Sequence, residues 1–310
     1  MSTRKLLTSL SVAGLLSLVS SVAFARGLVL QSKDLAAKER TTLTAAIAKA
    51  RSKHPVAFQR IAKAPAMARE MDQNKRGRAA TITRQLRAVG PEGLMPMLEM
   101  LAVDAPARGD LNDSAWTTLR VGLIEAVGEL RDARSKPVLL AVLAREKQFE
   151  VVRAAAEALG KLGDDDSAMR LIAMANNPGD SRLPILAALG ECRRAVIAKE
   201  LSRQAVTNDE PTLRVVVDSL SDVGNSWAWE TPAVAKVKEQ NEVRGVATTA
   251  LVNVFLKHGG YVREKAARAL LVVAHPNAVP MLQVARPHAD ARTQARIDAL
   301  LKDLAPRVRP

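Results

Sequence analysis

The feature that most constrains the fold is a repeat with a period of about 31 residues. Five related segments each place a basic residue near the start of a helical pattern and an apolar pair six or seven residues later. The equivalent apolar positions are Val127, Leu159, Leu189, Leu220 and Leu251, which are spaced by 32, 30, 31 and 31 residues. Units of this length cannot bury an apolar face alone, so they are expected to stack on one another.

Two further copies extend the repeat in both directions. An earlier copy aligns Leu86 with these positions, and a later copy aligns Leu270, which follows Leu251 by only 19 residues. The short step predicts either a missing second helix or an irregular repeat near Trp227, and the sequence leaves this choice open. Residues 78–304 are therefore predicted to form the repeat region, irregular near 224–262.

Each unit is predicted to be a pair of helices. In the unit that begins at Val151, apolar residues recur at helical spacing over 152–162 and again over 168–175. Apolar residues make up 48% of the chain but aromatic residues only 3%, and Ala, Leu and Val dominate the apolar set, which favours helices over strands. We expect an all-α solenoid of stacked helical hairpins.

Three consecutive aspartates, Asp164–Asp166, lie between the two helical patterns of this unit. Gly163 suits the left-handed end of the first helix, and Asp166 or Ser167 can accept hydrogen bonds from the amides that begin the second. The equivalent turns read "RDARSKP" and "CRRAVIA", which are chemically unlike three adjacent carboxylates. We therefore interpret the aspartates as a turn rather than a metal site.

The segment "VRAAAEALGKLGDDDSAMRLIAM" resembles the HEAT repeat, in the short form also seen in phycobilisome lyases. The resemblance covers roughly residues 78–286 and implies a curved solenoid. It departs from the pattern in "SLSDVG" and "NSWAWETP". It also implies a structural ladder, in which a recurring basic residue pairs with an acidic residue of the neighbouring repeat; a partner-binding surface is the alternative. The basic residues are Arg120, Arg153, Arg182, Arg214, Arg244 and Arg263, and the candidate acidic partners are Asp132, Asp164 and Asp222.

The two ends of the chain lack the repeat pattern. Residues 26–77 are predicted to form a basic helical cap over the first repeat, and residues 305–310 a frayed tail. The first 25 residues have the features of a secretory signal peptide: Arg4 and Lys5, an apolar run, and Ala23-Phe24-Ala25. We expect cleavage after Ala25, a periplasmic or secreted protein, and no transmembrane span in the mature chain.

The single cysteine, Cys192, excludes an intramolecular disulfide and lies on an apolar helical stripe, which predicts a core position. The chain has a formal net charge of +14, and the charge is concentrated at its ends. Residues 26–110 sum to +8, 111–230 to −3 and 231–310 to +7. The basic residues cluster most densely at Lys75, Arg76, Arg78, Arg84 and Arg87.

This cluster is either a solvated helix face or a salt-dependent binding surface for anionic lipid or envelope polymer. Export argues against nucleic acid as the partner. A second candidate surface is "DVGNSWAWETP", where Trp227, Trp229 and Glu230 interrupt the repeat. The two indoles either bind a partner or fill the core of an irregular repeat.

No catalytic, metal-binding or phosphate-binding motif stands out, so we predict no enzyme activity and no cofactor. The leading hypothesis is an exported scaffold that binds a protein partner. Because HEAT-like folds include bilin lyases and DNA glycosylases, the resemblance also permits an enzyme built around Asp222, Trp227, Trp229 and Glu230. The signal peptide argues against both of those chemistries.

Overall fold

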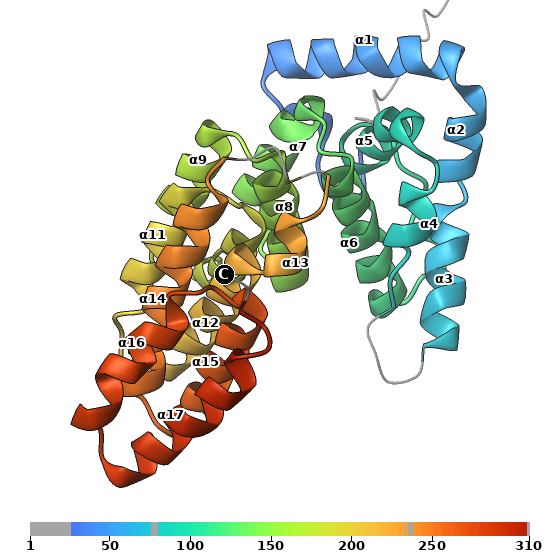
Figure 1. The fold of residues 1–310 in the computed structure, drawn as a ribbon. Helices are drawn as coiled ribbons and strands as arrows, with labels where there is room; N and C mark the ends of the chain where they lie inside the picture. Colours follow the sequence, from blue (N-terminus) through green and yellow to red (C-terminus); the bar gives the residue numbers. More distant parts are fainter. Residues whose placement is uncertain (1–25, 76–79, 233, 235–237, 309–310) are drawn as a thin grey trace, which may run out of the picture.

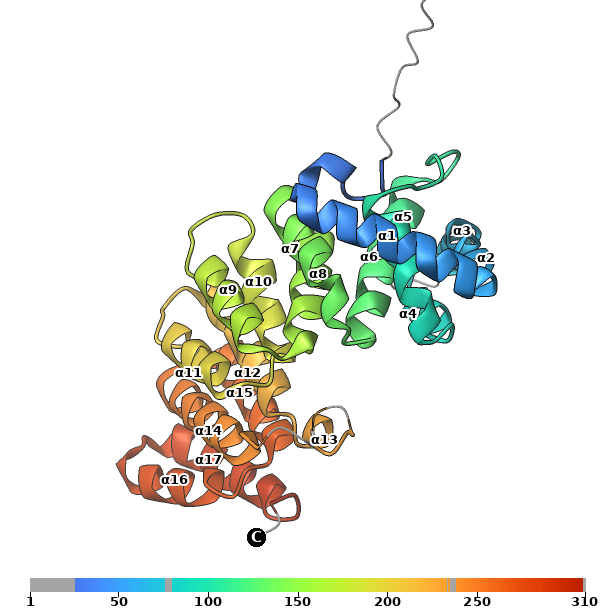
Figure 2. The same cartoon turned by 90° about the horizontal axis from the view of Figure 1, so that it is seen from above.

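A computed structural model describes residues 26–75, 80–232, 234 and 238–308 of the chain. Over these residues the regular structure is helical, apart from one isolated β-bridge between Arg26 and Gln31. The expected all-α solenoid is confirmed. Figures 1 and 2 show helices stacked side by side in an arch, with α6, α8 and α13 bordering its open side.

The stack has two layers, as Figure 2 shows. Helices of the first layer face the open side and pack on one another in sequence order. They are α4 (Thr83–Arg87), α6 (Asp113–Glu129), α8 (Phe149–Leu162), α10 (Arg182–Ala188), α12 (Glu210–Gly224), α15 (Gly260–Val273) and α17 (Ala291–Leu304). The second layer consists of α5 (Leu94–Ala102), α7 (Lys136–Arg145), α9 (Asp165–Ala175), α11 (Ala195–Gln204), α14 (Gln240–Lys257) and α16 (Ala278–Ala285).

Short 3₁₀ turns join or extend these helices. They are η1 (Ser32–Asp34), η2 (Pro91–Gly93), η3 (Ala133–Ser135), η4 (Leu189–Glu191) and η5 (Arg286–His288). The sequence explains the tight turn between α8 and α9: Gly163 is left-handed with φ 71°, and the Asp164 side chain accepts a hydrogen bond from the Ser167 amide at 3.0 Å. The turn prediction is confirmed, although Asp164 rather than Asp166 or Ser167 is the capping residue.

The repeat signature sets how closely first-layer helices approach. Val127, Leu159, Leu189 and Leu220 are fully buried, and a glycine follows each of the first three. A Cβ atom on Gly128 would lie 2.7 Å from the Cα and Cβ atoms of Ala158 on α8. Glycine therefore allows a backbone approach that any larger residue would prevent.

The predicted register is wrong after Leu220. Leu251 lies on α14, a second-layer helix, whereas Leu270 lies on α15 and continues the first layer after α12. Within the described residues, the last hairpins are α12 with α14 and α15 with α16, so each of these first-layer helices has its second helix. The irregularity is an insertion between α12 and α14 that carries the short helix α13 (Ser226–Trp229).

The N-terminal helices α1 (Ala37–Lys53), α2 (Pro55–Ile61) and α3 (Ala64–Asn74) pack on α5 and α6. Ahead of them, Leu28 and Leu30 are buried, and their amides donate to the carbonyls of Met100 and Leu101 at 2.8 and 3.1 Å. These bonds satisfy carbonyls that the end of α5 leaves free. Figure 1 shows α1 lying across the ends of the α5 and α7 hairpins.

At the other end, residues 305–308 extend α17 by a further turn rather than fray. The amides of Arg307 and Val308 donate to the Leu304 carbonyl at 2.9 and 3.0 Å. Residues 309–310 and the predicted signal peptide lie outside the described part of the chain. Among the described residues, no helix combines the length and apolar character needed to cross a bilayer.

Candidate functional site

The two tryptophans predicted to act together both lie in the insertion between α12 and α14, but in different environments. Trp229 is only 1% exposed, and its indole Nε1 donates to the Val223 carbonyl at 2.9 Å. Trp227 is 79% exposed. Residues two apart on a helix point to nearly opposite sides, so one indole anchors α13 in the core while the other is presented to solvent. The core interpretation is correct for Trp229 and wrong for Trp227.

Local hydrogen bonds hold α13 in place. The Asn225 side chain accepts from the amides of Trp227 and Ala228 at 3.1 and 3.4 Å, which caps the helix. The Ser226 hydroxyl donates to the Val272 carbonyl on α15 at 3.1 Å. Together with the buried Trp229, these bonds fix the backbone from which Trp227 projects.

An open pocket of about 890 Å³ lies beside Trp227, between α13, the start of α14, the end of α15 and the chain after α17. We call it the Trp227 pocket. Its apolar wall consists of Trp227, Leu271, Val272, Ala274, Pro276 and Pro306. Its polar lining consists of Asn225, Ser226, Glu230, Gln240, Asn241, Arg244, His275 and Arg307.

Arg244 lines the pocket and also hydrogen-bonds the end of α15. Its Nη2 atom donates to the carbonyls of Val273 and Ala274 at 2.8 and 3.0 Å. These carbonyls end α15, where Ala274 adopts a left-handed conformation with φ 45°. A cation at a helix C-terminus is electrostatically favourable. Burial lowers the pKa of Arg244, and the nearby Glu230 carboxylate opposes this shift.

His275 contributes no positive charge to the pocket at neutral pH. Its Nε2 and the Asn241 Oδ1 atom lie 3.1 Å apart, and its Nδ1 accepts from the Asn277 amide at 3.3 Å. This pattern fits a neutral ring that donates through Nε2. Burial, and then the charge of Arg244, lowers the pKa of His275 below its usual value.

The predicted arginine ladder forms contacts, but with other partners. Three of the arginines contact side chains: Arg120 contacts Glu146 and Gln148, Arg153 contacts Glu157 of its own helix, and Arg182 contacts Gln204 and Thr212. Arg214 lies over the Tyr261 ring. Arg263 donates to the backbone carbonyls of Phe255 and His258. Among the described residues, none of the six ladder arginines pairs with Asp132, Asp164 or Asp222. Arg244 lies on a second-layer helix, so its position is not equivalent to the other five.

The hairpin turns contain arginines that the sequence analysis missed. Arg131 donates to the Lys161 carbonyl at 2.6 Å, and Arg194 donates to the Gly163 carbonyl at 2.9 Å, so two neighbouring hairpins bind the end of α8. Arg244 binds the end of α15 in the same manner. The sequence pattern that could have identified these arginines is a basic residue at or just after each turn, rather than the basic residue near the start of the first helix.

Asp164 and Asp222 differ sharply. Although burial alone would raise it, hydrogen bonds from Lys136 and Ser167 hold the pKa of Asp164 at about 2. Asp222 is exposed near the end of α12, where desolvation by nearby protein and the charges of Glu191 and Asp218 raise its pKa to about 6. Asp222 does not line the Trp227 pocket. The residues of the enzyme hypothesis are therefore not gathered in one site.

The predicted basic cluster is partly occupied by internal contacts. Lys75 contacts Asp72 and Ser114, and an Arg87 nitrogen lies 3.6 Å from a Glu129 oxygen. Arg84 is exposed. Arg76 and Arg78 lie outside the described residues. Cys192 is buried, as predicted, and its burial raises the pKa of its thiol to about 12.

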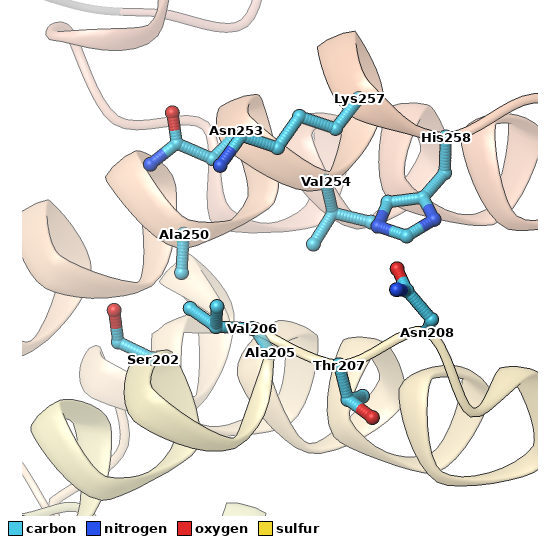
Figure 3. A pocket seen from close by; sticks show the side chains of 10 residues that line it. All are labelled: Ser202, Ala205, Val206, Thr207, Asn208, Ala250, Asn253, Val254, Lys257 and His258. Atoms are coloured by element: carbon cyan, nitrogen blue, oxygen red, sulfur yellow. The ribbon is translucent and has the colours of Figure 1, made fainter.

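A second pocket, of about 310 Å³, lies between α11 and α14. It forms because α14 has 18 residues and α11 has 10, so α14 extends past its neighbour. Figure 3 shows His258 and Asn208 facing each other across this pocket, with Val206 below Ala250. Val206 is 81% exposed. Over the described residues, no group of three or more His, Cys, Asp or Glu side chains could hold a metal ion.

Comparison with known proteins agrees with this architecture. Residues 110–190 match the family model for HEAT repeats. Among solved structures, human deoxyhypusine hydroxylase in complex with glycerol is similar over 81% of this chain and 97% of that chain, at 18% identity and a TM-score of 0.31. No curated protein sequence matches the chain significantly. The hairpin stack and the matched segment together identify the chain as a HEAT-like repeat protein.

Proposed function

We propose that the protein is an exported scaffold that acts by binding, and that it docks a protein partner through the Trp227 pocket. The observation that carries this proposal is the 79% exposure of Trp227 on a backbone fixed by its neighbours. Tryptophan is among the residues that contribute most to protein interfaces. An anchor held in place before binding loses little conformational entropy on association.

The location of the pocket supports the same function. The insertion interrupts an otherwise regular stack, and α13 borders the open side of the arch (Figures 1 and 2). A solenoid provides a long, rigid surface, so a partner that contacts Trp227 can extend along the first-layer helices. Export is an expectation from the N-terminal sequence, and we propose the periplasm or the cell envelope as the place of action.

The test is affinity capture with residues 26–310 from an envelope extract of the source organism, followed by cross-linking and mass spectrometry. Trp227→Ala is compared with Val206→Ala, which also removes an exposed apolar side chain but at the second pocket. We expect one discrete protein that survives high salt, is lost with Trp227→Ala and is retained with Val206→Ala. Equal capture by Trp227→Ala would refute the docking site.

Two further results separate the alternatives. If only lipid or acidic polymer is captured, and high salt removes it, the basic cluster is the functional element instead. Fractionation of cells that produce the epitope-tagged full-length chain tests export. We expect a shortened product in the periplasmic or secreted fraction; a full-length product confined to the cytoplasm would contradict the proposed location.

A further inference from the structure

We infer that the Trp227 pocket binds an acidic segment of its partner, in which a carboxylate lies next to an apolar side chain. This inference rests on the proposed docking function and specifies the chemistry of the partner. The occupant is a peptide segment of another protein, since the pocket is open and its lining combines apolar and charged side chains.

The charges of the lining favour a carboxylate. Among the described residues of the lining, Arg244 and Arg307 are cationic, Glu230 is anionic, and His275 is neutral at pH 7. Within the described chain, the hydrogen bonds of Arg244 use Nη2 alone, and its Nε is buried without an acceptor. A buried Nε cannot reach a ligand, so Nη1 is the donor that remains for a carboxylate. Arg is the side chain best suited to carboxylate recognition.

The surrounding charge acts in the same direction. Residues 231–310 sum to +7, whereas residues 111–230 sum to −3. The pocket is lined mainly by residues from the basic part. A field of this sign increases the encounter rate with acidic segments and disfavours basic ones.

The apolar residues of the lining indicate which type of partner residue lies next to the carboxylate. The lining includes Trp227 from α13, Val272 from α15 and Pro306 from the chain after α17. Proline and tryptophan side chains lose little rotamer freedom when a ligand covers them. A Leu or Phe of the partner can pack here while the adjacent carboxylate reaches Arg244 or Arg307.

The test uses three sets of fluorescein-labelled decapeptides that contain a central Leu or Phe flanked by Glu, Gln or Lys. Binding is measured by fluorescence anisotropy. We expect the Glu set to bind about tenfold more tightly than the Gln set, as for one charge-assisted contact, and the Lys set to bind least. Equal affinities for Glu and Gln, or tightest binding of the Lys set, would overturn the inference.

Variants assign the preference to the pocket. Arg307→Gln should reduce the Glu preference several-fold without affecting the fold, and Arg244→Gln should remove most of it. Because Arg244 also binds the end of α15, Arg244→Lys and circular dichroism control for misfolding. Trp227→Ala should weaken the Glu and Gln sets alike, and Val206→Ala neither.

The two proposals can fail separately. If no peptide set binds while Trp227-dependent capture of a protein persists, the acidic-segment inference is wrong and the scaffold function stands. If peptides bind with unchanged affinity to Trp227→Ala, and capture is also unchanged, both proposals are wrong.

Discussion

At the scale of single residues, small side chains determine the stack as much as apolar ones do. Gly128, Gly160 and Gly190 each occupy the same position of the repeat, and a Cβ on any of them would approach the next hairpin closely. The clearest case is Gly128, where the contact would be 2.7 Å from the Ala158 Cα and Cβ atoms. This spacing is a property of the backbone, which cannot yield as a flexible side chain would.

We predict that Gly128→Ala lowers the free energy of unfolding by about 1–3 kcal/mol, the usual cost of overpacking. Alanine is ordinarily the better helix former by about 1 kcal/mol, so the expected sign is reversed by the contact. Gly245 on α14 is the matched control, because the nearest atom to its added Cβ is 3.9 Å away. Gly245→Ala should be neutral or stabilising. Urea unfolding of both variants measures the difference.

The raised pKa of Asp222 predicts that the free energy of unfolding depends on pH. The folded state retains its proton up to about pH 6, whereas the unfolded chain releases it near pH 3.8. Between these values the folded state binds more protons, so the free energy of unfolding falls as the pH rises. Asp222→Asn should therefore stabilise the protein at pH 7.5 and have no such effect at pH 4.

Because solvent screens this exposed carboxylate, we expect a gain of only ~1 kcal/mol at pH 7.5. Asp164 has the opposite behaviour. Its lowered pKa gives stability that is present above about pH 4 and is lost as the pH falls towards 2. Urea unfolding of Asp222→Asn and Asp164→Asn over this range should give differences of opposite sign, and parallel curves would contradict the assignment.

At the scale of elements, the short helix α13 buries one tryptophan side chain, Trp229, and exposes another, Trp227. Trp229→Ala should lower the free energy of unfolding by about 3–5 kcal/mol, as for other buried aromatic residues. Trp227→Ala should change it by less than ~0.5 kcal/mol, as for other surface positions. Urea unfolding tests both. If the two variants were equally stable, the division between core and surface would be wrong.

The alignment of the repeats from sequence is accurate where the 31-residue period is regular, and it fails after the insertion between α12 and α14. Val127 to Leu220 were aligned correctly because identical packing recurs at each position. Leu251 was misplaced because α14, like the first-layer helices, has an arginine near its start and an apolar residue seven positions later. This pattern alone does not distinguish the two layers. The pocket could not be predicted, since Trp227, Arg244 and His275 converge only through the tertiary packing of α13, α14 and α15.

At the scale of the whole molecule, a solenoid is held together by contacts between neighbouring units. Its ends therefore need separate protection. Residues 26–31 protect one end by hydrogen bonding to α5, and residues 305–308 extend α17 at the other, where Val308 packs against the core. Each end stabilises the hairpins nearest to it.

Deleting residues 26–31 should increase amide hydrogen exchange in α1, α5 and α6 while α15–α17 remain protected. Deleting residues 305–310 should produce the reverse pattern and serves as the matched control. Hydrogen exchange followed by mass spectrometry gives both results. A uniform loss of protection in either variant would show that the stack unfolds as a single unit.

The placement of Trp227 and Trp229 also gives the protein two optical probes. The chain has three tryptophans, and the third, Trp116, lies on α6 in a different part of the stack. A solvated indole emits at longer wavelength and is readily quenched by iodide, whereas a buried indole is shielded from it. Quenching of Trp227 therefore reports occupancy of the pocket, and the blue-shifted emission of Trp229 reports whether α13 is still docked. A single unlabelled sample can thus distinguish a partner that binds from a variant that unfolds.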